Sequence, residues 1–332
     1  MERIRSLFSK SSSPSFQILS DLHLEVGQQY SSFEIPTSAP YLILAGDIGR
    51  LIDYHSYLAF LALQTRRFEK VFLILGNHEF YGLSSTAGLE HARKLECESI
   101  LNRKLVLLYQ KRFDVPNSSV TILGCTLWSK IPEHARHVVQ MRVKDFQKIE
   151  NWTVDDHNAA YESDITWLKG QIADIHEENE AIAKGQPERN ILVVTHHAPS
   201  VQETASPNHV NNPWSSAFAT DLLTDEDWVN VKVWVFGHTH FTTEFKKCGI
   251  KVLSNQRGYV LPGSMEPKIN EKDKKKVYDV RRTIRIWCKM YIAESAASLS
   301  TYIPNVFQTI YTLLDFELLQ FDDLEFRLGV FS

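Results

Sequence analysis

The stretch Val71-Phe72-Leu73-Ile74-Leu75-Gly76-Asn77-His78-Glu79 joins a run of five apolar residues to a polar turn. A short apolar run that ends abruptly predicts a strand buried on both faces. The glycine lets the backbone turn tightly directly after the strand. Because open α/β sheets place their sites at the carboxyl ends of strands, we expect the polar residues of this turn to lie at a functional edge.

The same arrangement recurs along the chain. Further apolar runs end in polar or glycine-containing turns, at residues 16–19, 41–45, 120–123, 191–195 and 231–236. Helical patterns lie between several of them, at residues 54–70, 85–101 and 156–179. Alternating strands and helices predict a layered α/β architecture.

Four more of these strands are followed by residues that bind metals. The turns carry Asp21 and His23, then Gly46-Asp47, then His196 and His197, and last Gly237-His238-Thr239-His240. Imidazole, carboxylate and amide ligands suit Mn, Fe, Zn or Co, and the lack of thiolates argues against a structural zinc site. A shared carboxylate such as Asp47 would bridge two ions about 3.5–4 Å apart.

Each of these residues taken alone is more often a hydrogen-bonded residue of a core or loop, but together they favour a metal site. His196 is interpreted as the ligand of its pair because it directly follows the 191–195 strand. His197 is the alternative, or orients a ligand from behind. Glu79 is interpreted as polar loop chemistry.

Composition limits the class of protein. The chain has 332 residues and a formal charge of −4, which disfavours a nucleic-acid partner. The four isolated cysteines suit a reducing compartment. The N-terminal stretch lacks an apolar run of signal-peptide length, and no segment makes a convincing membrane span. We expect a cytoplasmic protein without a membrane partner; its protein partners are unknown.

Three regions are expected along the chain. Residues 1–15 form a flexible N-terminus, 16–262 the main domain, and 263–332 a C-terminal extension without an assigned fold. In the extension, residues 266–290 hold nine basic and four acidic side chains, whereas 291–332 hold one and six. Residues 132–150 are either a cap over the site or an ordinary surface helix, with Arg136 and His137 as candidates for substrate contact.

The ordered set Asp21-x-His23, Gly46-Asp47, Gly76-Asn77-His78, His196 and Gly237-His238-Thr239-His240 resembles the calcineurin-like metallophosphoesterases over residues 16–262. The resemblance implies an α/β fold, a four-layer αββα sandwich of two mixed sheets flanked by helices. It also implies the ligands of two divalent ions: Asp21, His23 and His240 for the first, Asn77, His196 and His238 for the second, and Asp47 for both. His78 would lie beside the leaving-group oxygen as phosphate stabiliser or proton donor, and Asp47 and His78 are the catalytic candidates.

The activity implied is hydrolysis of a small phosphate mono- or diester by a dinuclear phosphatase or phosphodiesterase. A hydroxide bridging the two ions would attack phosphorus, because bound metals lower the pKa of water toward about 7. Manganese is one expected ion. A non-catalytic scaffold and a metal-dependent nuclease are the alternatives, and the retention of all seven ligand positions disfavours the scaffold.

Details of sequence point to a branch of the family. The run Gly46-Asp47-Ile48-Gly49-Arg50 departs from the Gly-Asp-x-Val-Asp-Arg-Gly of protein phosphatases and the Gly-Asp-x-x-Tyr of purple acid phosphatases. The run His196-His197-Ala198-Pro199 is similar to the His-His-Pro-Pro of cyclic-nucleotide phosphodiesterases, with Ala198 as a departure. The segment from Asn255 to Tyr259 resembles a subgroup of small phosphoesterases.

Overall fold

The computed structural model describes residues 13–183, 186–209, 212–224, 228–261, 263–264 and 276–286. The chain divides into two compact units, of which the first comprises Met1–Ile182 and Glu188–Cys288. All elements described below belong to this unit. The flexible N-terminus predicted for residues 1–15 and the extension predicted for 263–332 fall mostly outside the described residues, so these limits stay predictions.

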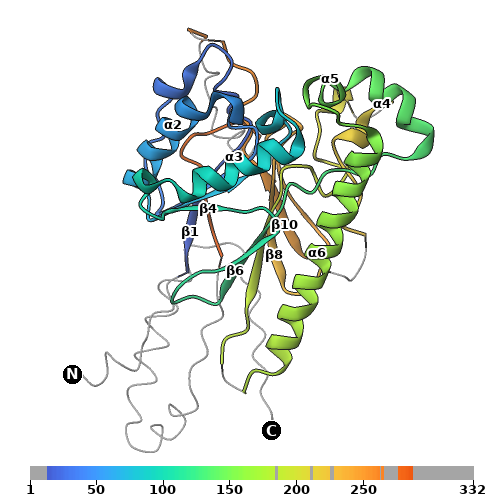
Figure 1. Cartoon of the computed structure of the whole chain (residues 1–332). Helices are drawn as coiled ribbons and strands as arrows, with labels where there is room; N and C mark the ends of the chain where they lie inside the picture. Colours follow the sequence, from blue (N-terminus) through green and yellow to red (C-terminus); the bar gives the residue numbers. More distant parts are fainter. Residues whose placement is uncertain are drawn as a thin grey trace, which may run out of the picture. The chain divides into compact units, whose positions relative to one another are not determined.

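The described strands form two mixed sheets (Figure 1). In the first sheet the order is β11-β1-β2-β3-β4, with β1 to β4 parallel and β11 antiparallel to β1. Its strands are β1 (Ser15–Leu19), β2 (Tyr41–Ala45), β3 (Lys70–Ile74), β4 (Leu105–Leu107) and β11 (Thr283–Arg285).

The second sheet has the order β5-β6-β7-β8-β10-β9. Strands β6, β7, β8 and β10 are parallel, and the two edge strands β5 and β9 run antiparallel to their neighbours. The bounds are β5 (Lys111–Asp114), β6 (Val120–Gly124), β7 (Asn190–Val194), β8 (Val231–Phe236), β9 (Glu244–Lys247) and β10 (Ile250–Ser254).

Both faces of the central strands are buried because side chains alternate along a strand. Phe72 and Ile74 of β3 belong to a cluster that also holds Ile122 of β6 and Val194 of β7, so this cluster lies between the two sheets. Val71 and Leu73 point to the other face and join the cluster that includes residues of the flanking helices.

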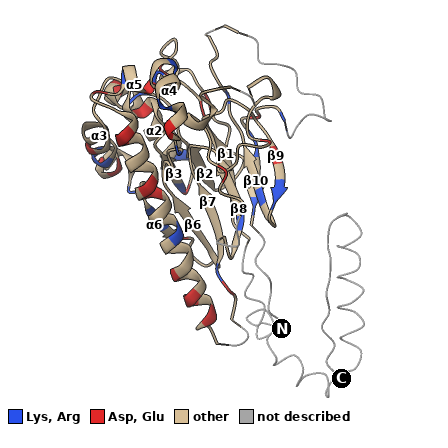
Figure 2. Ribbon diagram, turned by 90° about the vertical axis from the view of Figure 1, so that its right-hand side faces the viewer, with Lys and Arg blue, Asp and Glu red and all other residues tan. Residues whose placement is uncertain are grey.

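Helices flank the sheets. Their bounds are α2 (Tyr54–Arg67), α3 (Ser85–Cys97), α4 (Arg136–Arg142), α5 (Asp145–Lys148) and α6 (Val154–Glu180). Helices α2 and α3 contact strands of the first sheet, and α6 contacts the second. Figure 2 shows Asp and Glu recurring along α6, whereas Leu168, Ile172 and Ile175 of this helix are buried. The predicted α/β fold of two mixed sheets with flanking helices is confirmed.

The patterns predicted β1, β2, β3, β6, β7 and β8, but they missed the inner strand β10, the short edge strand β4 and the three other edge strands. The edge strands β5 and β9 read Lys-Arg-Phe-Asp and Glu-Phe-Lys-Lys, and such charged sequences are typical of sheet edges but carry no apolar run. Strand β11 lies in the segment assigned to the extension, yet it pairs with β1 through Phe16 and Ile284. No helix among the described residues combines the length and apolar character needed to cross a membrane.

Removing the Phe72 side chain tests the core between the sheets. Phe72 is fully buried, and its ring lies 5.0 Å from that of Phe113. Phe72→Ala is expected to lower the free energy of unfolding by about 3–5 kcal/mol, through lost burial and the cavity left behind. Leu63→Ala, at a side chain 39% exposed on α2, is the control. Urea unfolding that gave both variants the same loss would contradict the assigned core.

Candidate metal centre

Five turns carry the site, and each follows a strand at its carboxyl end. Three of the strands, β1, β2 and β3, belong to the first sheet, and β7 and β8 belong to the second. Five of the seven expected ligands have left-handed backbone, a conformation uncommon outside glycine: Asp21 (φ 53°), His23 (46°), Asp47 (53°), His238 (72°) and His240 (50°). Such backbone clusters at functional sites, where the surrounding structure must hold it in place.

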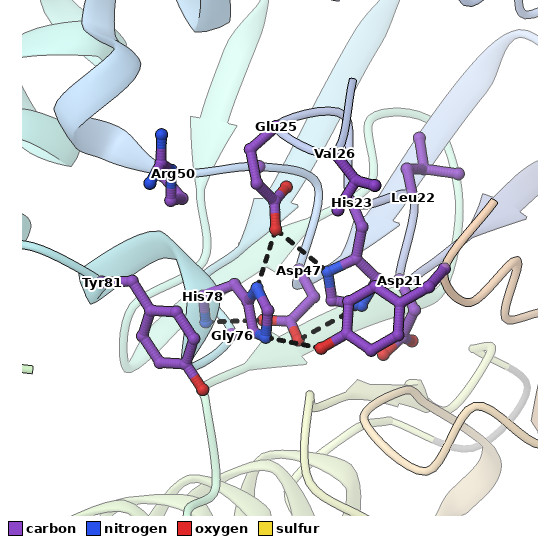
Figure 3. A network of polar contacts seen from close by, with 12 residues as sticks. Asp21, Leu22, His23, Glu25, Val26, Asp47, Arg50, Gly76, His78 and Tyr81 are labelled. Carbon is purple, nitrogen blue, oxygen red and sulfur yellow. Dashed lines mark hydrogen bonds and ion pairs between the residues drawn. The ribbon is translucent and has the colours of Figure 1, made fainter. Parts of the chain in front are cut away.

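Asp21, His23 and His240 form one group whose ligand atoms all lie within 4.8 Å of one another. Nε2 of His23 is 2.8 Å from Nε2 of His240, and Nε2 of His240 is 3.5 Å from Oδ1 of Asp21. The other ring nitrogen of His23 faces the Glu25 carboxylate at 3.3 Å, an arrangement that directs the Nε2 lone pair of a histidine toward a metal (Figure 3). These three side chains could therefore hold one ion.

Asp47, His196 and His238 form a second group on the same criterion. Nε2 of His196 lies 3.3 Å from Oδ1 of Asp47 and 3.2 Å from Oδ1 of Asn77. Nδ1 of His196 is 2.9 Å from the carbonyl oxygen of Ala45, so donation there leaves Nε2 for a ligand. Asn77 therefore lies beside this group, at the place expected for a ligand of the second ion.

The Asp47 carboxylate faces both groups. Its Oδ1 lies near His196, and its Oδ2 is 3.8 Å from Nε2 of His23. Burial opposes the charge of Asp47, but the neighbouring histidines, His196 foremost, hold the pKa of this carboxyl well below its usual range. An ionised carboxylate between two ligand groups has the placement of a bridging ligand.

The residues present fit a pair of divalent ions. Nε2 of His238 is buried and has no hydrogen-bond partner, although buried polar atoms are nearly always partnered. A Cβ at position 76 would lie 2.3 Å from Oδ1 of Asp47 and 2.6 Å from Nε2 of His196, so only glycine leaves the ligand atoms in place there. Nitrogen and oxygen donors without thiolate suit the metals expected from the sequence.

His197 has a different environment from His196. Its Nδ1 is 3.2 Å from Oγ of Ser129, and its ring stacks on that of His238 at 4.1 Å. Burial lowers the pKa of His197 well below its usual value, so the ring is neutral. Of the two candidates, the structure turns His196 toward the other ligands and places His197 behind them.

Glu79 has a role that its interpretation as polar loop chemistry did not anticipate. Its carboxylate is fully buried and accepts hydrogen bonds from the backbone N–H groups of Gly76, Asp47 and Ile48 at 2.7–2.9 Å. The hydroxyl of Tyr57 donates to it as well, at 2.9 Å. Burial, followed by the charge of Asp47, raises the pKa of Glu79 to about 7. The side chain thereby ties the turn after β2 to the turn after β3.

His78 lies beside the ligands and is linked to them through Glu25, which also faces His23 (Figure 3). Its Nδ1 is 2.8 Å from Oε1 of Glu25, and its Nε2 is 3.0 Å from the hydroxyl of Tyr259. Burial opposes protonation of His78, but Asp47 and Glu25 outweigh it and raise the pKa of His78 to about 9. Burial opposes the charge of Glu25, but its hydrogen bonds with His23 and His78 outweigh burial and lower the pKa of Glu25 to about 2. Sequence reasoning had singled out neither Glu25 nor the contact of Tyr259.

The segment 132–150 reaches the site through Asp145. Oδ1 of this buried carboxylate accepts hydrogen bonds from Nδ2 of Asn77 and from the hydroxyl of Tyr81, both at 2.7 Å. The amide nitrogen of Asn77 is thereby held away from His196, and its oxygen is left facing the second group. Asp145 lies 68 residues from Asn77 in the sequence, so this contact can be recognised only in the folded structure.

A cavity of about 380 Å³ opens at these ligands. Arg142, Val143, Lys144 and Asp145 line one side of it, so residues of the segment 132–150 cover part of the site. The two residues expected to touch substrate do not line it. Arg136 instead forms an ion pair with Asp155 at 2.7 Å.

Replacing Glu79 tests the tie between the turns. Glu79→Gln sets an amide N–H₂ against backbone donors, so we expect the free energy of unfolding to fall by about 1–3 kcal/mol and the metal content of the purified protein to fall with it. Glu98→Gln is the control, because Glu98 accepts from one hydroxyl, that of Tyr54, away from the site. Urea unfolding and elemental analysis check both variants; equal stability and metal content would refute the role.

Comparison with known proteins supports the fold and the family. An uncharacterized protein of Acanthamoeba polyphaga mimivirus is 27% identical over 271 residues, which cover 73% of this chain and 90% of that protein. The crystal structure of phosphopantetheinyl hydrolase from Mycobacterium tuberculosis shares the fold, with a TM-score of 0.54 and 19% identity over 75% of this chain and 91% of the other.

The family model for calcineurin-like phosphoesterase matches residues 15–241, a stretch that begins at β1 and ends just after His240. It spans all five turns that carry the site, and it confirms the resemblance seen in the sequence. The chain therefore belongs to the calcineurin-like phosphoesterase family.

Proposed function

We propose that this protein is a dinuclear metal-dependent phosphoesterase that hydrolyses a small phosphate mono- or diester. The observation that carries the proposal is the position of Asp47, whose two carboxylate oxygens face two separate groups of ligand atoms. Asp21, His23 and His240 would hold one ion, Asn77, His196 and His238 the other, and Asp47 both. When bound, the ions supply an activated water and neutralise charge on the phosphate oxygens.

His78 is proposed to serve the leaving group. Glu25 holds Nδ1 of its ring, so Nε2, now hydrogen-bonded to the Tyr259 hydroxyl, is the atom left to face a substrate. In hydrolysis the water oxygen bonds to phosphorus and the bond from phosphorus to the leaving oxygen breaks. The proton on Nε2 passes to that oxygen, the water releases one proton to solvent as it bonds to phosphorus, and solvent returns a proton to the ring.

Loss of a ligand side chain tests the dinuclear centre. We expect wild-type protein to retain about two metal ions per chain and to hydrolyse p-nitrophenyl phosphate or its bis-ester with Mn²⁺ added. Asp47→Ala and His238→Ala are each expected to abolish the activity and to lower the metal content. His176→Ala, at an exposed histidine of α6, is the control and should change neither.

The outcomes separate the alternatives. Full activity after chelation and dialysis would overturn the proposal. A folded protein that binds no metal would favour the non-catalytic scaffold. Metal-dependent degradation of single-stranded DNA without hydrolysis of small esters would favour the nuclease.

Leaving-group dependence tests the role of His78. His78→Ala is expected to slow hydrolysis of an alkyl phosphate by about 10²–10⁴, because an alkoxide needs a proton as it departs. The loss with p-nitrophenyl phosphate is expected to be much smaller, since nitrophenolate departs unprotonated. Glu25→Gln should also slow the alkyl phosphate more than p-nitrophenyl phosphate, but by a smaller factor than His78→Ala.

His91→Ala is the matched control for this series. His91 is half-buried on α3, and its Nδ1 bonds to the carbonyl oxygen of Ala87. Equal losses of His78→Ala on both substrates, with metal content unchanged, would contradict proton donation and leave His78 as a phosphate stabiliser.

A further inference from the structure

The cavity at the ligands is larger than a phosphate group needs. Its volume of about 380 Å³ lies at the lower end of the roughly 300–1,000 Å³ typical of sites for small organic ligands. Asp47, Asn77, His78, His238 and His240 form its floor. The remaining space must accommodate the organic part of a substrate whose phosphate lies on that floor.

Two segments far apart in the sequence build the walls. One contains Arg142 to Asp145, and the other contributes lining residues within 201–209 and 212–219. They pack on each other through a separate hydrophobic cluster, in which Val139 and Val143 meet Ala217 and the partly buried Phe218. The walls are therefore one packed unit rather than two independent loops.

The walls offer an apolar and aromatic surface. The ring of Phe218 stacks on that of His238, with centroids 4.6 Å apart and planes 22° apart, so the aromatic wall begins at the ligands. Along these two walls the apolar and aromatic side chains that line the cavity are Val143, Val201, Ala205, Trp214, Phe218 and Ala219, and elsewhere Tyr81 and Tyr259 line it as well. A ring or chain of carbon atoms fits such a surface.

Negative and positive side chains line different parts of the cavity. The lining carboxylates, Asp47 and Asp145, are both buried beside the ligands. The cations Arg142 and Lys144 are exposed at the wall, and Arg142 lies over the Trp214 ring with its guanidinium 5.7 Å from the centroid. Within the described part of the chain neither side chain forms an ion pair with a carboxylate, and the Lys144 ammonium donates a hydrogen bond to the side-chain oxygen of Gln147, at 3.3 Å.

We propose that the substrate is a phosphate ester whose organic part is apolar or aromatic and carries a second anionic group, which Arg142 and Lys144 bind at the wall. This inference rests on the proposed function and specifies its substrate class. A neutral ester would leave both cations without a counter-charge, and a cationic one would be repelled. The aromatic wall and the two cationic side chains would thereby discriminate among esters that the metal ions alone would bind with equal affinity.

A matched pair of esters tests the inference. The first is an aryl phosphate that carries a propanoate arm in the para position, and the second carries the corresponding propanamide. The two differ in one negative charge and hardly in shape or leaving group. We expect a KM about three- to tenfold lower for the propanoate with similar kcat, and a preference that shrinks as salt is added.

The double variant Arg142→Ala with Lys144→Ala is expected to remove that preference, so that the KM values for the propanoate and the propanamide become equal. The control is Lys232→Ala with Lys246→Ala, which removes the same charge at exposed residues outside the cavity lining. If the control lost the preference as well, net charge alone would explain it and the inference would fail.

Equilibrium binding separates this inference from the proposed function. The same pair is made as non-hydrolysable methylenephosphonates and titrated calorimetrically into metal-loaded wild-type protein and both double variants. Tighter binding of the propanoate, lost in Arg142→Ala with Lys144→Ala, supports the inference even if neither ester is hydrolysed, a result that would overturn the proposed function alone. Equal affinities, or no binding of either analogue, would overturn the inference, whatever the hydrolysis of simple esters.

Discussion

The buried carboxylate of Glu79 is the constraint on which the site depends. It accepts backbone hydrogen bonds from the turns after β2 and β3, and these turns carry Asp47 and Asn77. A left-handed Asp47 and a glycine at 76 are needed to bring the backbone so close, and an isolated chain would not hold that conformation. One acceptor that satisfies several donors from both turns keeps the two ligands at a fixed separation.

Sequence reasoning predicted most central strands of the fold, although not β10, and it predicted none of the edge strands. Strand β2 holds only apolar and aromatic residues, and β8 departs from that pattern only at the exposed Lys232, so their composition alone indicates them. The edge strands β5 and β9 are charged, because an edge must avoid pairing with other chains, and that requirement removes the pattern. Strand β11 was hidden in a segment whose composition reads as solvent-exposed, and its place is set by pairing with β1.

The ligand residues of the candidate centre were predictable because each follows a strand in a short motif. Their partners were not. Glu25, Asp145 and Tyr259 act at positions without a local signal, and each is identified only by what it contacts across the fold. Local sequence thus indicates the residues that meet an ion or a substrate, while the residues that orient them depend on tertiary structure, as outer ligand shells generally do.

The ligands come from both sheets, and this has a consequence for how the protein folds. Nε2 of His23 and Nε2 of His240 are 2.8 Å apart, although 217 residues separate them in the sequence. Contacts of such long range form slowly, because the chain loses the entropy of a large loop before the contact can stabilise it. The centre therefore needs both sheets in place, and a chain still emerging from the ribosome has no complete site until β8 and the turn after it have been made.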